Sequence, residues 1–183
     1  MTRVRGAVAA DANAVGLVGR LAFVRQYEGL VDPANYTWAA RQWYSDRAVL
    51  ESIEKCEKDP AACFLVAERD SEIVGFLQYD EAGPEPELHR IYVAPHARGL
   101  GIGRGLMTAL HERLPSTATY VLVVVEGNDA AVRFYERHGL REEGRVDAHG
   151  YYRETSGIVF PAEAEDFRCL LMRYRQGATS GTG

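Results

Sequence analysis

The chain has 183 residues, of which 46% are hydrophobic, and its formal net charge at pH 7 is −5. This length predicts one domain with a packed core, and the mildly acidic charge gives no support for nucleic-acid binding. No apolar run is long enough to span a membrane and the N-terminal residues lack the charged-then-apolar pattern of a signal peptide, so we expect a cytoplasmic protein. The three cysteines form no CxxC pair and the five histidines show no metal-ligand spacing, so we expect reduced thiols and no metal.

The N-terminal third predicts a short strand and two helical regions. Residues 2–9 favour a first strand, and Asp11 is a candidate N-cap for a helix that ends near Tyr27. A turn at Asp32-Pro33 separates this helix from a second helical region at 34–57, which is rich in Trp and Tyr. These rings either line a pocket or pack in the core, and the pattern leaves both alternatives open.

Strands follow in the middle of the chain. Residues 62–68 and 73–79 predict a hairpin, and 81–87 predict a loop that leads into a strand at 88–93. After a helix, the almost wholly apolar residues 120–125 predict a strand that is buried on both faces of a mixed sheet.

A glycine-rich turn connects the strand at 88–93 to the helix that runs to about Leu114. Arg98, Gly99, Gly101 and Gly103 stand in this turn, and helical spacing begins inside it. The first turn of a helix has N–H groups without partners and a dipole that favours anions, and glycines let a ligand approach the backbone closely. Neither the dinucleotide fingerprint GxGxxG nor the P-loop fits this spacing. The turn therefore predicts a cradle for a phosphate or pyrophosphate of another kind.

The C-terminal part predicts a helix at 129–138, capped by Asn128, and strands at 141–146 and 167–174. The connection at 147–166 is too long for a hairpin loop, and its length favours a functional segment. The composition of 177–183 predicts a flexible tail, which places the single domain at 1–176.

Two segments together resemble one known family. The residues Arg98 to Gly103 are similar to the R/Q-x-x-G-x-G/A signature of the GCN5-related N-acetyltransferases. A second element of that family, N-x-x-A-x-x-F/Y-Y-x-x-x-G-F, is matched by Asn128, Ala131, Phe134, Tyr135 and Gly139, with Leu140 where phenylalanine is usual. The resemblance covers about 62–145.

The resemblance implies an α+β fold with a mixed, mostly antiparallel sheet of six or seven strands and helices on both faces. The strands at 88–93 and 120–125 are then parallel neighbours that splay at their ends. Acetyl-CoA is the implied co-substrate, with its pyrophosphate on the loop. The implied cofactor contacts are Ile91, Tyr92, Val93, Arg98, Gly99, Leu100, Gly101, Ile102, Gly103, Arg104, Asn128 and Tyr135.

Acetyl transfer to an amine needs a base, because an amine with a pKa near 10 is mostly protonated at neutral pH. Glu87 stands where histone-type members of the family place their base, and by strand parity it shares a face with His89, Ile91 and Val93. Glu87 is alternatively a plain strand-start residue, and His89 is then the base. In the family, a tyrosine at the place of Tyr135 assists the leaving thiolate, and the free N–H of Val93 is the expected oxyanion donor.

These features predict an N-acetyltransferase that acts on a small, polyamine-like or other primary amine by direct attack in a ternary complex. Tyr27, Glu28 and His89 are the expected acceptor contacts. A protein N-terminal or lysine acetyltransferase and a non-catalytic acyl-CoA-binding regulator are the alternatives. We expect no nucleic-acid or membrane partner, and a homodimer is compatible with each alternative.

Overall fold

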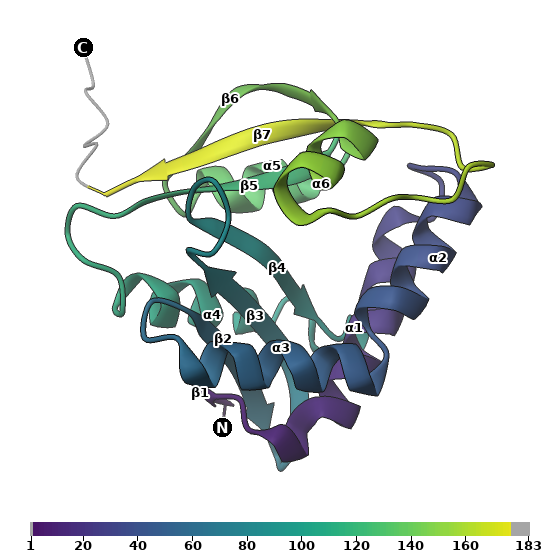
Figure 1. The fold of residues 1–183 in the computed structure, drawn as a ribbon. Helices are drawn as coiled ribbons and strands as arrows, with labels where there is room; N and C mark the ends of the chain where they lie inside the picture. The colour runs from purple at the N-terminus through teal and green to yellow at the C-terminus, as the bar shows by residue number, and fades with distance from the viewer. Residues whose placement is uncertain (1, 177–183) are drawn as a thin grey trace.

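The computed structural model describes residues 2–176, and its centre is one seven-stranded sheet (Figure 1). The strand order is β1-β2-β3-β4-β5-β7-β6, and each neighbouring pair is antiparallel except β4 with β5. The strands are β1 (Thr2–Gly6), β2 (Cys63–Arg69), β3 (Glu72–Asp80), β4 (Glu87–Val93), β5 (Thr119–Val125), β6 (Leu140–Asp147) and β7 (Arg168–Arg175). The mixed, mostly antiparallel α+β fold is confirmed, whereas the predicted tail at 177–183 lies outside the described residues.

Helices cover both faces of this sheet. They are α1 (Ala12–Tyr27), α2 (Pro33–Trp43), α3 (Asp46–Lys58), α4 (Ile102–His111), α5 (Asp129–Glu136) and α6 (Ala148–Ser156). Short 3₁₀ turns precede α1 (Ala9–Asp11) and α4 (Pro95–Ala97). Within residues 2–176, no helix combines the length and the apolar character that crossing a membrane requires.

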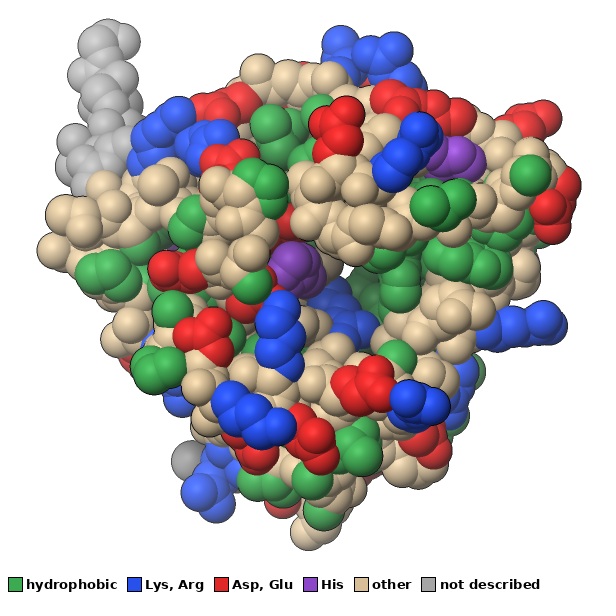
Figure 2. Space-filling view, in the orientation of Figure 1, with side chains coloured by type: hydrophobic (Ala, Val, Ile, Leu, Met, Phe, Trp, Pro, Cys, Tyr) green, Lys and Arg blue, Asp and Glu red, His purple; other side chains and the backbone are tan. Residues whose placement is uncertain are grey.

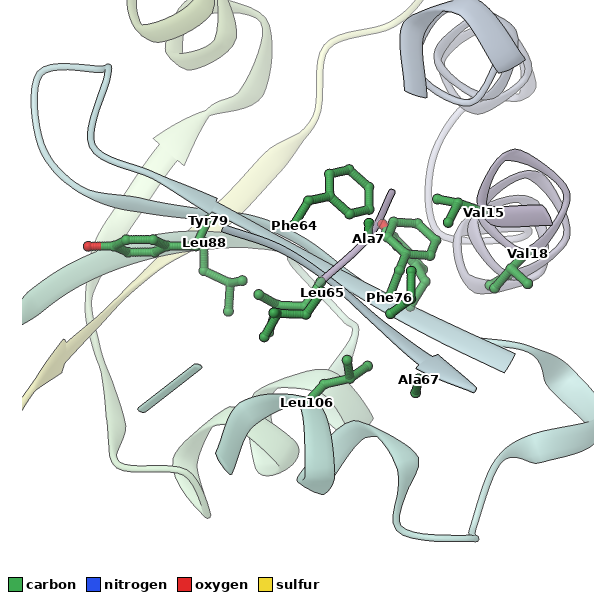
Figure 3. Close-up of a cluster of buried hydrophobic side chains, with 14 of the residues drawn as sticks. Ala7, Val15, Val18, Phe64, Leu65, Ala67, Phe76, Tyr79, Leu88 and Leu106 are labelled. Carbon is green, nitrogen blue, oxygen red and sulfur yellow. The ribbon is translucent and has the colours of Figure 1, made fainter. Parts of the chain in front are cut away.

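The core follows from the alternation of side chains along the strands. Phe64 and Phe76 stack with their ring centroids 5.8 Å apart on the face that Val15 and Val18 of α1 cover (Figure 3). The next residue along β2, Leu65, lies on the other face, toward Leu106 of α4 (Figure 3). Each face of the central strands is therefore buried under its own helices.

The second helical region is two helices rather than one. α2 ends at Trp43, and Ser45 then caps α3 by accepting a hydrogen bond from the Ala48 N–H at 3.2 Å. Between them, Tyr44 is buried between Phe23 and Phe76, with ring centroids 5.4 and 6.1 Å away. The prediction of one helical region at 34–57 missed this break. The chain turns where the Tyr44 ring is buried, and hydrophobic periodicity does not report the burial of a single ring.

Asp11 precedes α1 as predicted, but its carboxylate does not cap that helix. It accepts two hydrogen bonds from the Arg5 guanidinium, at 2.7 and 2.9 Å, and one from the Val8 N–H at 2.9 Å. The bidentate guanidinium contact is a stronger interaction than a cap, so Asp11 ties the first strand to the turn instead.

β4 and β5 are parallel neighbours that separate, as the family resemblance implied. Their register contains a single pair, Glu87 with Val121, and the Val121 N–H donates to the Pro86 carbonyl at 2.9 Å. Beyond this pair β5 continues its pairing with β7. The C-terminal half of β4 therefore has an open edge on the β5 side, where a ligand can lie.

Candidate active site

The glycine-rich turn has the geometry of an anion cradle. Gly99 and Gly101 adopt φ of 78° and 77°, a left-handed conformation that a side chain would strain. Gly101 is also the N-cap of α4 and has no side chain that could accept a hydrogen bond. The Gly105 N–H donates to the Gly101 carbonyl at 2.9 Å and makes the first hydrogen bond of the helix. The preceding N–H groups of the first turn thus remain available to an anion, together with the positive end of the helix dipole.

This turn forms one wall of a groove of about 970 Å³ between β4, α4 and α5. Arg98, Arg104 and Arg137 line it and give it positive charge, whereas Leu100 is 52% exposed and does not belong to the lining. Asn128 caps α5 by accepting from the Ala131 N–H at 3.2 Å, and its Nδ2 is buried without a partner among the described residues. An arginine-lined groove with free backbone donors and one orphaned amide donor fits an extended ligand that carries phosphates.

The N–H of Val93 points into the splay between β4 and β5. In an antiparallel ladder the N–H groups of successive residues point to opposite edges. The Ala94 N–H donates to Val74 of β3 at 2.8 Å, so the Val93 N–H faces away from β3, toward the edge that β5 leaves open. Val93 also lines the groove. This geometry supports the predicted role of its N–H as an oxyanion donor.

A second cavity of about 290 Å³ adjoins the groove on the side of α1 and α3. Figure 2 shows a hollow on this face with a histidine and basic side chains at its edge. Five residues line both cavities: Gln26, Ile91, Tyr92, Ala131 and Tyr135. The two cavities therefore meet at β4 and at the Tyr135 ring.

The helix α6 forms part of the second cavity through Tyr152 and Ser156, and Ile158 follows it in the lining. The sequence predicted a loop at 147–166, so the helix itself was missed. Asp147 caps α6 by accepting from the Gly150 N–H at 2.6 Å. The expectation that this long segment serves the site is supported by its place in the wall.

A β-bulge in β4 decides which face Glu87 occupies. Glu87 pairs with Asp80, and Arg90 pairs with Gln78, so His89 lies in the bulge between Leu88 and Arg90. Asp80 and Gln78 are two residues apart on β3 and share a face, and Glu87 and Arg90 therefore share that face as well. The prediction that Glu87 shares a face with Ile91 and Val93 was wrong, because it assumed an unbroken alternation.

Glu87, His89 and Asp80 form a chain of ionisable groups in the second cavity. His89 Nε2 lies 3.0 Å from Asp80 Oδ1, and His89 Nδ1 lies 3.7 Å from Glu87 Oε1. Burial raises the pKa of Glu87, although the His89 charge and the nearby Tyr151 hydroxyl act in the opposite direction. Burial also opposes ionisation of Asp80, but His89, the Ala82 N–H and Lys55 outweigh it and hold the Asp80 pKa below its usual range.

The Tyr135 ring is half-buried where the two cavities meet. Burial raises the pKa of its phenol well above the ordinary value, so the hydroxyl stays protonated and is a donor at neutral pH. Two further tyrosines lie beside it, with the Tyr27 and Tyr92 hydroxyls 3.4 Å apart. Among the expected acceptor contacts, Tyr27 and His89 line the second cavity, whereas Glu28 is exposed at the end of α1 and lies outside the lining.

The structure adds cavity residues that the sequence did not indicate. Asp80, Lys55 and Arg90 come from β3, α3 and β4 and meet only in the folded chain. Their strand and helix patterns carry no mark that sets them apart from surface charges. The one available signal was the length of the segment at 147–166, which indicated a functional segment but neither the helix α6 nor Tyr152 within it.

Comparisons with known proteins agree with this geometry. Residues 30–140 match the model of the Acetyltransferase (GNAT) family. A mycothiol acetyltransferase of Thermobispora bispora is 37% identical over 103 residues, which are 50% of this chain and 35% of that protein. The chain thus spans about a third of the length of this relative.

A probable spermine N(1)-acetyltransferase of Bacillus subtilis subsp. natto is 26% identical over 116 residues, which are 55% of this chain and 76% of that protein. Among solved structures, the PaiA N-acetyltransferase from Thermoplasma acidophilum in complex with coenzyme A has a TM-score of 0.73. It is 19% identical, and the match covers 96% of this chain and 99% of that one. This structural likeness shows the fold.

Proposed function

The chain belongs to the acetyltransferase (GNAT) family, and on that basis we propose that it transfers the acetyl group of acetyl-CoA to a primary amine of a small molecule. Acetyl-CoA is the co-substrate of this family, and the groove fits it. The loop from Arg98 to Arg104 holds the pyrophosphate, and the open edge of β4 receives the extended pantetheine arm.

One observation carries the proposal: the groove and the second cavity share the Tyr135 ring and the middle of β4. A thioester that enters along the groove and an amine that enters the cavity therefore meet without a carrier residue. This favours direct attack in a ternary complex, with the approach of the two reactants supplied by the shape of the protein.

Each reacting atom then has a partner in the chain. Glu87 removes the proton of the ammonium group, directly or through water, and its raised pKa brings it closer to that of the amine. The N–H of Val93 stabilises the negative charge that develops on the carbonyl oxygen as the C–N bond forms. Tyr135 donates its proton to the sulfur as the C–S bond breaks, and the second proton that the nitrogen loses restores the Tyr135 hydroxyl. Acetyl-CoA supplies the activated acetyl group.

The shape of the cavity favours a small acceptor over a protein. Its walls come from α1, α3, β4 and α6, and aromatic side chains such as Trp43 and Tyr152 narrow it. Their ring centroids are 5.5 Å apart, so α6 is packed against the end of α2 above the cavity. A cavity of about 290 Å³ with this aromatic lining can enclose a free amine as a whole.

The test is the release of free CoA thiol from acetyl-CoA across a panel of small amines, lysine-containing peptides and peptides with free N-termini. We expect thiol release with small amines and formation of the N-acetyl product in equal amount. Release only with peptides would favour the protein acetyltransferase. Tight acetyl-CoA binding without thiol release for any acceptor would favour the non-catalytic regulator.

A further inference from the structure

Arg90 is a cation in the second cavity that has only neutral partners among the described residues. Its Nε donates to Gln78 Oε1 at 2.7 Å, and its two terminal nitrogens donate to the Trp43 carbonyl and to Ser52 Oγ, each at 2.9 Å. Its guanidinium carbon also lies 5.3 Å from the centroid of the Tyr44 ring and 5.6 Å from that of Phe64. A guanidinium has five N–H donors, so two donors remain without a partner among the described residues, and the charge faces aromatic rings and neutral acceptors but no carboxylate.

The other charges that line the cavity already have partners. Lys55 lies 3.2 Å from Asp80, whose second oxygen faces His89, and Glu87 faces the other nitrogen of that imidazole. The two carboxylates are thus engaged with Lys55 and His89, and neither is within ion-pair distance of Arg90. A half-buried cation without a counter-charge is costly, and an anion that enters the cavity gains from it.

On the basis of the proposed function, we propose that the acceptor amine carries an anionic group, a carboxylate or a phosphate, which the Arg90 guanidinium binds. The amine end of such a molecule faces Glu87 and the anionic end faces Arg90, which share one face of the sheet. A polyamine, the acceptor that the sequence suggested, would place a second ammonium group in the field of this cation. Arg90 therefore selects amino acids or amino phosphates over diamines.

A purely structural role makes a different prediction. Arg90 joins β4 to the end of α2 and to α3, so its loss also weakens that junction. A loss of packing would lower the activity toward every amine equally. Loss of an anion contact lowers the activity toward anionic amines alone, and it does so through KM because the contact is present before and during the reaction.

The experiment compares kcat/KM for three groups of short amines. The first group carries a carboxylate (glycine, β-alanine and 4-aminobutyrate), and the second carries a phosphate (2-aminoethyl phosphate). The third group carries no anion and contains the alcohols ethanolamine and 3-aminopropanol and the diamine 1,4-diaminobutane. The wild-type protein should prefer an anionic amine over its neutral counterpart by about 10–100-fold, the range for a hydrogen bond to a charged group. The first two groups distinguish a carboxylate from a phosphate. Equal or greater kcat/KM for the diamine overturns the proposal.

Three variants test whether Arg90 causes the preference for anionic amines. Arg90→Met should lose most of it through KM, and Arg90→Lys should retain part of it, because the charge stays but the forked geometry is lost. Lys55→Met is the matched control, because Lys55 is a cation of the same cavity whose charge Asp80 already neutralises. The ratio of kcat/KM between anionic and neutral amines should be unchanged in this variant. An unchanged ratio in Arg90→Met overturns the proposal, and acetyl-CoA affinity by calorimetry shows whether each variant is folded.

Failure of the proposed function has a separate signature. If no amine releases thiol, calorimetric titration of the same amines into the CoA-bound wild-type protein still tests Arg90. Saturable binding of the anionic amines, abolished by Arg90→Met, supports the anion site without catalysis. No binding of any anionic amine overturns it.

Discussion

Asp80 fixes the imidazole of His89, with Oδ1 of the carboxylate 3.0 Å from Nε2 of the ring. The aspartate side chain is only 4% exposed, and Lys55 holds its second oxygen at 3.2 Å. The other ring nitrogen of His89 is thereby directed toward Glu87. The expected base thus lies at the end of a chain of polar side chains that Asp80 anchors, which is the geometry of a positioning residue.

Asp80→Asn should destabilise the protein at neutral pH. The folded-state pKa of Asp80 lies below its unfolded value near 3.9, so its stabilisation is fully present above that pH and is lost as pH falls through the folded pKa. We expect the variant to lose about 1–3 kcal/mol of unfolding free energy at pH 7, measured by urea denaturation. The difference in unfolding free energy between the variant and the wild type should become smaller below pH 4.

The matched control for this prediction is Asp46→Asn. Asp46 is 54% exposed and lies 3.5 Å from Arg20, so its contribution should be small at every pH. A stability difference for Asp80→Asn that stays constant from pH 7 to pH 3 would show that its charge is not the source.

Glu87→Gln should lower kcat/KM most on the acidic side of the amine's pKa. There the amine is protonated and depends on the base, and the typical loss is about 10²–10⁴-fold. The loss should shrink as pH approaches the pKa of the amine, because the neutral amine then forms unaided. In the wild type, activity should fall as pH drops through the raised Glu87 pKa, because the base becomes protonated.

The pH profile of kcat/KM for both proteins is the measurement, with Glu57→Gln, an exposed residue of α3, as the control. Wild-type rates for Glu87→Gln across the whole pH range would remove Glu87 from the mechanism and leave His89 as the base.

Tyr135→Phe should lower kcat and leave acetyl-CoA affinity nearly intact. The ring still packs at the junction of the two cavities, but the protonated hydroxyl that assists the thiolate is gone. Because a CoA thiol is a good leaving group, we expect a loss near the low end of general acid catalysis, about 10²-fold. Single-turnover kinetics and calorimetry separate the two quantities.

Tyr174→Phe is the control for this change, since Tyr174 stacks on His111 with centroids 4.4 Å apart and lines neither cavity. A Tyr135→Phe enzyme whose kcat equals that of the control would limit Tyr135 to a packing role.

Gly103→Val should weaken CoA binding at least about 10-fold, because more than one contact of the first helical turn is disturbed. A Cβ at Gly103 would lie 3.2 Å from the Phe134 ring, so this ring of α5, which also lines the groove, has to shift. Gly101→Val should act by another route: its added Cβ meets open space, but its φ of 77° is unfavourable for a side chain.

Gly105→Ala provides the control on the same helix, where the added methyl would make ordinary contact with Val4 at 3.7 Å. Its CoA affinity by calorimetry should match that of the wild type. Equal affinities for Gly103→Val and Gly105→Ala would contradict the placement of the phosphates on this loop.

The sequence alone determined the features that depend on neighbouring residues. Gly99 and Gly101 suit a left-handed backbone and the following periodicity requires a helix, so the loop and its ligand class could be predicted without the fold. The family resemblance then implied that β4 and β5 are parallel neighbours, which the structure confirms.

Only the tertiary structure decided how the cavity is charged. The bulge at His89 turns Glu87 toward Asp80 and Arg90, and no local pattern marks it, because a bulge arises from how two strands match each other rather than from either strand alone. The contact of Arg90 with Trp43 and Ser52 likewise joins residues 47 and 38 positions apart. Such pairings depend on packing across the whole chain, which is why the sequence predicts the cofactor loop but only the folded structure shows which charges line the second cavity.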